Sequence, residues 1–420
     1  MAEILNLNIQ SEIGELEGVI LHTPGAEVEN MTPGTAQRAL YSDILNLSIA
    51  QQEYEQLTGV LSRVAEVYEV RALLEKVLDQ WKPRADLITR ICQTEDVMSY
   101  LDTLMAMSSA ELARVLIEGL PARIDTLTSY LNNEYYALYP LYNFYFTRDA
   151  AVTVGNNALV CRMANKVRMR ESLIMDAIYR YSGAFECGVI DANAGQPETS
   201  QVIMEGGDII IAREDILIIG NGVRTTPQGI DFMVDNFRRS CPEGNGHVLV
   251  QQLPSKPESF IHLDMVFTLL DRDKCMVYEP LVLRDNQYQT VHITIEDGKV
   301  SKIRSIPTIL HALRELGMDL EPVACGGSSD EWNQEREQWH SGANFFALAP
   351  GRLLSYSRNV NTLEELSKHG FEIIPAWDII QGNKDAADYG KCVITIEGSE
   401  LPRGGGGARC MTMPVRRKSL

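Results

Sequence analysis

The sequence predicts an α/β protein in which small β-rich units recur along the chain, interrupted once by a block of helices. Pairs of short apolar runs, separated by turn residues, recur every ~55 to 80 residues after residue 150, with helical stretches between several of them. Residues 71–134, in contrast, hold successive helical stretches and almost no glycine. A ring of small β-rich units fits this pattern, and a plain βαβ sheet is the alternative.

The first 70 residues read as a strand, a turn and a long helix. Val19–Leu21 is a short apolar run that ends at the turn residues His22-Thr-Pro-Gly25. From about Leu45 to Val64, apolar residues recur at helical spacing. A short strand is expected to follow at 67–70.

Residues 71–134 are predicted to form an inserted helical subdomain, so that residues 1–70 and 135–420 together make the catalytic α/β domain. Ser108 and Glu111 form a capping box ahead of a helix that runs to Leu120. Pro121 is expected to end that helix, and a further helix is expected to run to about Leu131.

Four β-hairpins are predicted after residue 150, because turn residues join each pair of apolar runs. Their strands are expected at 151–154 with 158–161, 209–212 with 216–219, 265–270 with 275–278, and 345–348 with 353–356. A polar cluster precedes each of the first three hairpins, and these clusters are Phe146 to Asp149, Glu205 to Asp208, and His262 to Asp264. If the units surround an axis, the clusters meet at one end of it.

The composition excludes several classes of protein. Asp and Glu number 57 and Lys and Arg 38, so the formal charge of −19 argues against a nucleic-acid-binding surface. No apolar run approaches the ~18 to 20 residues that a membrane-spanning helix needs, and no signal peptide is visible. We therefore expect a cytoplasmic protein. Its eight cysteines are expected to be reduced, and none has the spacing of a zinc site.

Two of the polar clusters admit both a functional and an ordinary structural interpretation. His262 lies two residues before Asp264, so both face the same side of an extended strand, although a lone histidine is usually structural. Glu205 precedes two glycines, which suit either a plain turn or the close approach of a ligand.

The same ambiguity applies to the remaining candidates. Asp149 follows Arg148, as in an ordinary surface ion pair. Cys410 comes shortly after four glycines, which is unlike the setting of a core cysteine, and Arg409 beside it would favour a thiolate. Each signal is weak alone, but together they indicate a site.

A thiol, a histidine and three carboxylates suit chemistry on a guanidinium group. The chain has no Walker sequence, no dinucleotide fingerprint and no nucleophile elbow. Carboxylates disfavour an anionic substrate, but they match the planar array of donors of a guanidinium. The central carbon of that group is electron-poor enough for a thiolate to attack. The residues therefore predict nucleophilic substitution at an amidine or guanidine carbon, with no metal and no cofactor.

These residues resemble the arginine deiminase family, with matches that run in order from residue 11 to residue 415. The matching motifs include Phe146-Thr-Arg-Asp149, Met204-Glu-Gly-Gly-Asp208, His262-Leu-Asp264-Met-Val-Phe267, Arg409-Cys410-Met-Thr-Met-Pro414, Ser11-Glu-Ile-Gly and Gly342-Ala-Asn344. The resemblance implies the guanidine-modifying enzyme fold, a five-bladed pseudosymmetric propeller of ββαβ units. It also implies a helical insertion near 71–134 and hydrolysis of L-arginine to L-citrulline and ammonia.

The resemblance assigns a role to each catalytic candidate. Cys410 would attack the guanidinium carbon, and Asp149 and Asp264 would hold the guanidinium nitrogens. His262 would protonate the departing ammonia and then activate water against the thiouronium intermediate. Glu205 would orient His262 and stabilise its charge.

The resemblance also implies a set of substrate-binding residues. Arg168 and Arg224 fall on the positions that bind the substrate carboxylate. The other implied contacts are Asn143, Phe146, Leu40, Gly404 and either Arg403 or Arg409. The chain departs from the family pattern at Arg409, where the family usually has histidine, and in an all-glycine run at 404–407, where the family often has an arginine.

Two alternatives remain beside deimination of arginine. An amidinotransferase of the same fold would pass the amidine to an amine instead of to water, and a non-catalytic protein would only bind arginine. Two arginines at the far end of the substrate disfavour agmatine and peptidyl arginine, because both lack a free carboxylate there. L-Arginine is the expected small-molecule partner, a homo-oligomer is expected, and neither nucleic acid nor a membrane is an expected partner.

Overall fold

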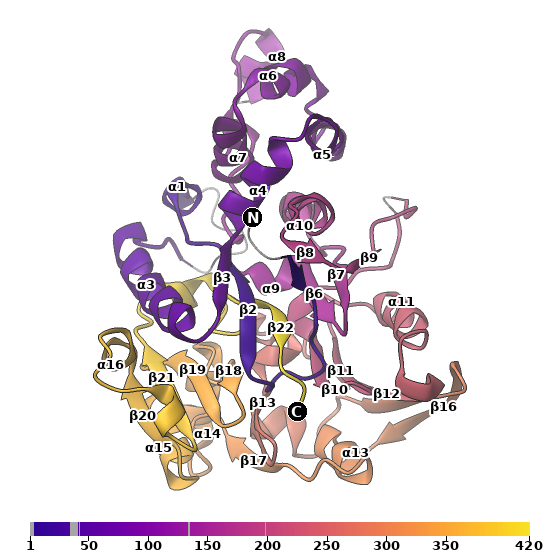
Figure 1. The fold of residues 1–420 in the computed structure, drawn as a ribbon, viewed down its shortest axis with the longest axis vertical. Coiled ribbons are helices and arrows are strands. Elements are labelled where there is room, and N and C mark those ends of the chain that lie inside the picture. Colours follow the sequence, from indigo (N-terminus) through magenta and orange to yellow (C-terminus); the bar gives the residue numbers. More distant parts are fainter. Residues whose placement is uncertain (1–3, 34–40, 42, 133–134, 198) are drawn as a thin grey trace.

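The structure is a computed structural model, and it describes residues 4–33, 41, 43–132, 135–197 and 199–420. The fold is mixed α/β (Figure 1). Several separate sheets share one pattern, in which an antiparallel pair of strands is extended on one side by a parallel strand. No sheet within these ranges closes on itself. Leu40 lies outside the described residues.

All four predicted hairpins are confirmed. They are β6 (Ala151–Val154) with β7 (Asn157–Val160), β10 (Ile209–Arg213) with β11 (Ile216–Asn221), β13 (Phe267–Asp271) with β14 (Lys274–Val277), and β18 (Phe346–Ala349) with β19 (Arg352–Tyr356). Their strands are almost wholly buried, which explains why they read as continuous apolar runs rather than as alternating ones. β13 begins two residues later than predicted because Leu263–Met265 forms a 3-10 turn.

A crossover helix and a parallel strand complete each of these units. The parallel strands are β9 (Gly188–Asp191), β12 (Gly246–Gln252), β17 (Glu321–Ala324) and β21 (Cys392–Ile396). The crossover helices are α10 (Met169–Tyr181), α11 (Pro227–Phe237), α13 (Ile309–Glu315) and α15 (Val360–Lys368). β20 (Glu372–Pro375) and α16 (Ala376–Ile380) lie between α15 and β21. Parallel neighbours need such a crossover, since a tight turn cannot join them.

The two ends of the chain build a further sheet with the same pattern. β22 (Met413–Arg417) pairs antiparallel with β2 (Leu16–Leu21), and β3 (Glu66–Glu69) pairs parallel with β2. The crossover between β2 and β3 contains α3 (Leu47–Val64), in agreement with the predicted helix. This sheet holds the segment after Cys410 against the N-terminal segment.

One hairpin was not predicted. β15 (Thr290–Glu296) and β16 (Lys299–Ile306) extend the sheet of β10 and β11 beyond β12. The turn between them is Asp297-Gly298, and both residues have positive φ, as a type I′ turn requires. Most of β16 is exposed, so its apolar pattern is too weak to mark it as a strand.

The pairing of β12 with β15 brings two histidines together. His247 Nδ1 lies 3.1 Å from His292 Nε2, and Arg304 Nη2 lies 3.4 Å from His292 Nδ1. Burial, with the nearby His247 and Arg304, lowers the pKa of His292 to about 4. Burial also lowers the pKa of His247, which the nearby Asp215 only partly offsets.

We expect the protein to lose about 2 to 3 kcal/mol of stability at this pair as the pH falls from 6.5 towards 4, because the unfolded chain then binds protons more readily than the folded chain does. The full stability is present above pH 6.5, the pKa of a histidine in the unfolded chain, and part of it is lost as the pH falls below that value. Urea unfolding at pH 7 and pH 5 measures the effect. In His292→Gln, the difference between the two pH values is expected to shrink, and an unchanged difference would contradict the assignment.

Most of residues 70–132 are helical and stand at the top of Figure 1. The helices are α4 (Val70–Leu78), α5 (Trp81–Thr94), α6 (Leu101–Ala106), α7 (Ser109–Glu118) and α8 (Leu127–Asn132). Ser108 caps α7 as predicted, since its Oγ accepts from the N–H of Glu111. The predicted end of this helix was wrong. α7 stops at Glu118, before Gly119 with φ 98°, and Pro121 lies in the short strand β4 (Leu120–Pro121).

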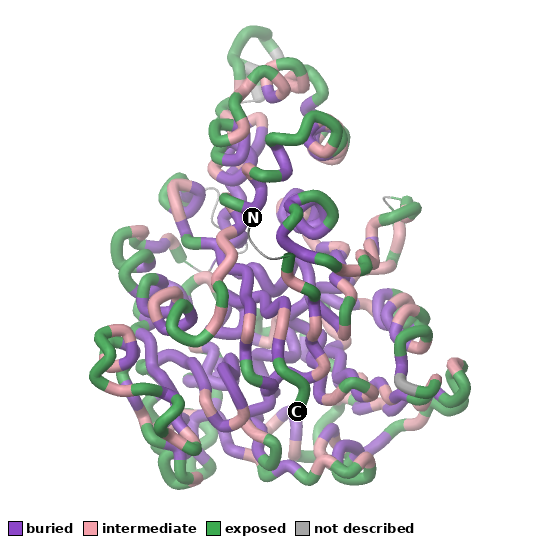
Figure 2. The backbone as a smooth tube through the Cα atoms, in the orientation of Figure 1, coloured by how far each residue is buried: buried purple, intermediate pink, exposed green. Residues whose placement is uncertain are grey.

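The helical block shares a hydrophobic core with the sheets. Buried residues of α4 and α5, such as Leu74 and Ile88, belong to the same cluster as Ile174 and Ile178 of α10. Figure 2 shows that the buried residues are concentrated in the central strands and that the exposed residues lie at the periphery. Within the described ranges, the helices are all too short or too polar to span a membrane.

Candidate active site

The three polar clusters are short helical turns, each placed directly before the first strand of a hairpin. These turns are α9 (Thr147–Ala150) before β6, η3 (Gly206–Asp208) before β10 and η6 (Leu263–Met265) before β13. α9 contacts η3, and η3 contacts η6. Because each hairpin presents its cluster at the same end, side chains from distant parts of the sequence meet.

One small cavity is lined by most of the residues that the sequence singled out. They are Asn143, Phe146, Asp149, Arg168, Arg224, His262, Gly404 and Cys410. Ile261, Gly405 and Gly406 complete the lining. Glu205 and Asp264 lie behind it, where they contact His262 and Cys410 respectively. All five side chains to which the family resemblance assigns a catalytic role are buried.

The thiol of Cys410 lies between an amide and a carboxylate. Its Sγ accepts from Asn344 Nδ2 at 3.2 Å and lies 3.6 Å from Asp264 Oδ2. Asn344 Oδ1 accepts in turn from the backbone N–H of Cys410 at 3.3 Å. Burial raises the pKa of Cys410 well above its ordinary value, and the charges of Asp264 and Asp149 raise it further. The group is therefore a neutral thiol at pH 7 in this structure.

Asn344 was not predicted as a site residue. The only signal in the sequence was its place in the motif Gly342-Ala-Asn344, which follows a helix rather than a polar cluster. The structure shows why an amide belongs here: its Nδ2 also donates to the carbonyl of Asp264, so one side chain holds both Cys410 and the turn that carries Asp264.

His262 is held between two carboxylates. Its Nε2 lies 2.9 Å from Glu205 Oε2, and its Nδ1 lies 3.6 Å from Asp149 Oδ1. Burial alone would lower the pKa of His262, but Asp149 and the hydrogen bond to Glu205 raise it to about 9. The imidazole is therefore protonated at pH 7. A Cβ on Gly207 would lie 2.5 Å from His262 Nδ1, so only glycine at position 207 leaves room for the imidazole ring.

The two arginines predicted for the substrate carboxylate contact carboxylates of the chain itself. Arg168 Nη1 lies 2.7 Å from Asp149 Oδ2, and Arg168 Nη2 lies 2.7 Å from Glu171 Oε2. Arg224 Nη1 lies 3.2 Å from Glu205 Oε2. Both guanidinium groups thus reach the cavity, and each neutralises one of its acidic groups.

Arg409 is buried behind the cavity instead of lining it. Its Nη1 lies 2.8 Å from Asp264 Oδ2, and its Nη2 lies 2.9 Å from Glu12 Oε1. Burial would raise the pKa of Glu12, but Arg409 and Arg148 lower it to about 2, so Glu12 is ionised. Arg409 therefore holds Asp264 Oδ2, the same oxygen that lies 3.6 Å from Cys410 Sγ, and its charge lowers the pKa of the thiol less than either carboxylate raises it.

Arg403 lies at a neighbouring groove, on the surface. It pairs with Asp43 and, at 3.3 Å, with Glu400. Gly404 lines both this groove and the catalytic cavity. Arg403 lines only the groove. The approach to the glycine run is fixed by Glu53 of α3, whose carboxylate accepts from the backbone N–H groups of residues 399–401.

Asp149, Glu205 and His262 also have the spacing of a metal site, since one ligand atom of each lies within 4.8 Å of the others. Arg168 and Arg224 pair with the two carboxylates, and His262 bonds to Glu205. Two cations in contact with the ligand set would repel a third. The ion pairs explain these residues better than a metal centre does.

Two solved structures share the fold of this chain. The chain is similar to an amidinotransferase from Microseira wollei in the saxitoxin biosynthetic pathway, with TM-score 0.53, 12% identity and coverage of 99% and 98% of the two chains. It is similar to DDAH from Pseudomonas aeruginosa complexed with citrulline, with TM-score 0.51, 13% identity and coverage of 95% and 99%. The protein thus has the same mixed α/β fold as these two structures.

The chain belongs to the arginine deiminase family, whose model matches residues 37–417. Among its relatives is an arginine deiminase of Bacillus cytotoxicus, 32% identical over 99% of both chains. Another, of Listeria monocytogenes, is 30% identical over 99% of this chain and 98% of the relative.

Proposed function

We propose that the protein is an arginine deiminase, which hydrolyses L-arginine to L-citrulline and ammonia. One observation carries the proposal: the thiol of Cys410 shares a buried cavity with a protonated His262 and the carboxylate of Asp149, and Asp264 lies 3.6 Å from the sulfur. A nucleophile, an acid and two anionic anchors are what substitution at a guanidinium carbon needs. Membership of the family supports arginine as the substrate.

Substrate binding would activate the nucleophile. Asp149 and Asp264 accept hydrogen bonds from the guanidinium nitrogens, and the positive charge of the substrate offsets the two anions that raise the pKa of Cys410. The thiol then loses its proton to solvent when the substrate arrives, and Asn344 Nδ2 donates to the thiolate.

Two half-reactions would follow. The thiolate adds to the guanidinium carbon, His262 protonates the leaving nitrogen, and ammonia departs as the C–N bond breaks, which leaves a thiouronium on Cys410. Neutral His262 then takes a proton from water while the water oxygen adds to the same carbon. The C–S bond breaks, the departing sulfur takes the hydroxyl proton of the tetrahedral adduct, and citrulline is released with Cys410 again a thiol. Glu205, 2.9 Å from His262, stabilises the imidazolium in each half-reaction.

The remaining site residues would set specificity. Arg168 and Arg224 exchange their contacts with Asp149 and Glu205 for contacts with the substrate carboxylate. The residues proposed to line the rest of the substrate are Asn143, Phe146, Leu40 and Gly404. Agmatine lacks the carboxylate, so we expect it to be a poor substrate.

The rate is expected to fall as the pH rises through about 9, because His262 must be protonated to release ammonia. In Glu205→Gln, the alkaline limb of kcat is expected to move to lower pH, since the hydrogen bond and charge that raise the pKa of His262 are weakened. Glu15→Gln, an exposed change that removes a surface ion pair, serves as control. Identical alkaline limbs in the parent and Glu205→Gln would contradict this role.

Citrulline release from L-arginine, with agmatine as comparison, tests the proposed function. Citrulline from arginine with agmatine nearly inert supports deimination and the roles of the two arginines. Binding of arginine without citrulline formation would refute it and would point to a binding protein or a transferase.

One observation favours amidinotransfer as a second candidate function: a solved structure with the same fold is an amidinotransferase. It would transfer the amidine from Cys410 to an amine acceptor. Product analysis with glycine or ornithine added separates the two reactions, since only transfer makes a new guanidino compound.

We further propose that the recurring sheets are the blades of a five-bladed pseudosymmetric ring, closed by the pairing of β22 with β2. Residues 71–134 would then be a helical subdomain inserted after β3, with residues 1–70 and 135–420 as the catalytic domain. The eight unpaired cysteines are consistent with a cytoplasmic location, and the charge of −19 is consistent with no nucleic-acid partner. A homo-oligomer remains our prediction.

A further inference from the structure

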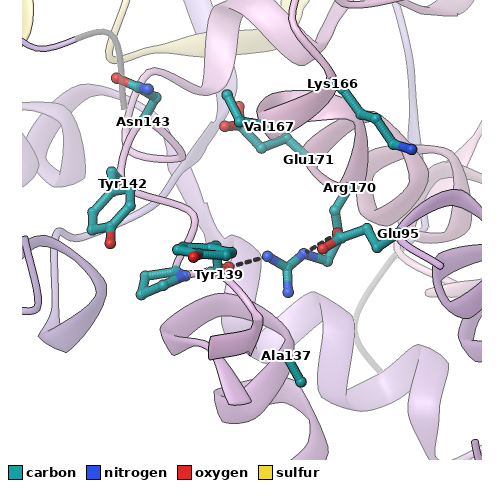
Figure 3. Close-up of a pocket in the computed structure, with 10 residues that line it drawn as sticks. Glu95, Ala137, Tyr139, Tyr142, Asn143, Lys166, Val167, Arg170 and Glu171 are labelled. Carbon is teal, nitrogen blue, oxygen red and sulfur yellow. Dashed lines mark hydrogen bonds and ion pairs between the residues drawn. The ribbon is translucent and has the colours of Figure 1, made fainter. Parts of the chain in front are cut away.

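A second cavity lies where the helical block meets the sheets, next to the candidate active site (Figure 3). Its volume is about 270 Å³. The lining comes from the end of α5, the segment 137–143, the 3-10 turn η2 (Lys166–Arg168) and the start of α10: Glu95, Ala137, Tyr139, Pro140, Tyr142, Asn143, Lys166, Val167, Arg170 and Glu171. Asn143 is the one residue in the linings of both this cavity and the catalytic one.

A buried arginine faces this space with an unused donor. Arg170 is only 2% exposed, and Figure 3 shows its guanidinium between Tyr139 and Glu95. Its Nη2 donates to the carbonyl of Tyr139, and its Nε lies 3.0 Å from Glu95 Oε1. Nη1 is buried and has no hydrogen-bond partner, and Nε, whose contact with Glu95 is an ion pair without a hydrogen bond, has none either. A buried donor without an acceptor is costly, so Nη1 indicates a missing acceptor.

A second cation lies at the rim of the same cavity. Lys166 is exposed, and its Nζ lies 3.4 Å from Asp96 Oδ2. Both partners are largely exposed, so this pair is weak and easily exchanged. The two acidic groups in the lining already have cationic partners: Glu95 pairs with Arg170, and Glu171 with Arg168. Lys166 is therefore the cation of this lining whose ion pair is exposed and weak, while Arg170 offers a donor, Nη1, rather than an unpaired charge.

The rest of the lining is mostly planar or apolar. They are formed by Tyr139, Pro140, Tyr142 and Ala137. A ligand held by its charge at Arg170 would thus place an uncharged body against aromatic rings and a proline. This lining, with few polar groups and a specific charge, is typical of small-molecule sites.

We propose that this cavity binds a small carboxylate whose body is planar or apolar. The carboxylate accepts from Arg170 Nη1 and Lys166 Nζ, and the body packs on Tyr139 and Tyr142. The pair of Arg168 and Glu171 separates this site from Cys410. Because Arg168 also contacts Asp149, an occupant is energetically linked to the catalytic cavity, as expected of an effector site.

Calorimetric titration with sodium benzoate at constant ionic strength tests the proposal without any turnover. We expect saturable binding with Kd of ~1 mM and binding of benzyl alcohol at least ~10-fold weaker, since the alcohol has the same ring and no charge. Lys166→Met is expected to weaken benzoate binding about 3- to 10-fold. Lys418→Met is the matched control, because Lys418 is similarly exposed and, like Lys166, pairs with a surface carboxylate.

Two further variants locate the binding site. Arg224 lines the catalytic cavity but not this one, so Arg224→Ala is expected to keep benzoate affinity. Arg170→Gln is expected to lose saturable binding while it keeps a cooperative thermal transition. If Arg170→Gln does not fold, the Lys166→Met result decides.

The proposal is overturned if benzoate does not saturate below ~50 mM, or if benzyl alcohol binds equally well. It is also overturned if Lys166→Met binds benzoate like the parent, or if Arg224→Ala abolishes binding. Since binding is measured directly, failure of arginine turnover would leave this result unaffected.

Discussion

The Cys410→Ala protein is expected to release citrulline from L-arginine at least ~100,000-fold more slowly than the parent, because it has lost the atom that attacks the substrate. No other cysteine lines the cavity formed by the described residues, so none replaces it. The fold is expected to remain intact. Asn344 keeps its bond to the carbonyl of Asp264 when Sγ is removed, and the change from cysteine to alanine removes a single heavy atom.

Citrulline assay and arginine titration of the same preparation give the measurement. Cys275→Ala is the matched control, since Cys275 is also buried and unpaired but belongs to a hydrophobic core away from the cavity. It is expected to cost some stability and to keep the activity within about threefold. Citrulline formation by Cys410→Ala above ~1% of the parent rate would exclude Cys410 as the nucleophile.

The Asp264→Asn protein is expected to lose ~1,000-fold in kcat while the pKa of its Cys410 thiol falls. The lower pKa would favour the thiolate, yet kcat is expected to fall, because Asp264 has two roles. The carboxylate lies 3.6 Å from Sγ and raises the pKa of the thiol, so its removal makes the thiolate easier to form. The same change removes an anchor for the guanidinium, and a more ionised nucleophile cannot compensate for a substrate that is wrongly held.

The measurement combines steady-state kinetics with the pH dependence of Cys410 alkylation by iodoacetamide, a neutral reagent. Arg224→Ala is the comparison variant, and it is expected to raise KM for arginine more than it lowers kcat, because it contacts the far end of the substrate in the proposed complex. Arg409 retains Glu12 when Asp264 is changed, so unfolding is not expected to explain the loss. Equal losses of kcat with unchanged KM in both variants would contradict these roles.

Local chemistry made much of the fold predictable. Each of the four hairpins combines two apolar runs with a turn of glycine, asparagine, aspartate or proline, and such turns depend on only a few adjacent residues. The helix at 47–64 and the cap at Ser108 are equally local. The predicted end at Pro121 failed because Gly119, two residues earlier, adopts a φ of 98° that terminates the helix first.

The sequence by itself also determined which residue types reach the cavity. The polar clusters sit directly before buried strands, so their place at one end of each unit follows from the order of residues along the chain. That order predicted a thiol, a histidine and carboxylates close together, and hence chemistry on a cationic carbon. It did not indicate Asn344 or Glu12, because neither belongs to such a cluster.

Only the tertiary structure decided how those groups are paired. In the folded protein, Arg409 pairs with Glu12 and Asp264 instead of lining the cavity, and Arg168 pairs with Asp149. The tertiary structure also paired β22 with β2 and brought Arg170 to a second cavity. These partners lie from about twenty to about four hundred residues apart, where no local rule of turn or period applies. A buried charge turns toward whichever opposite charge the completed packing places within reach, and that choice exists only once the chain is folded.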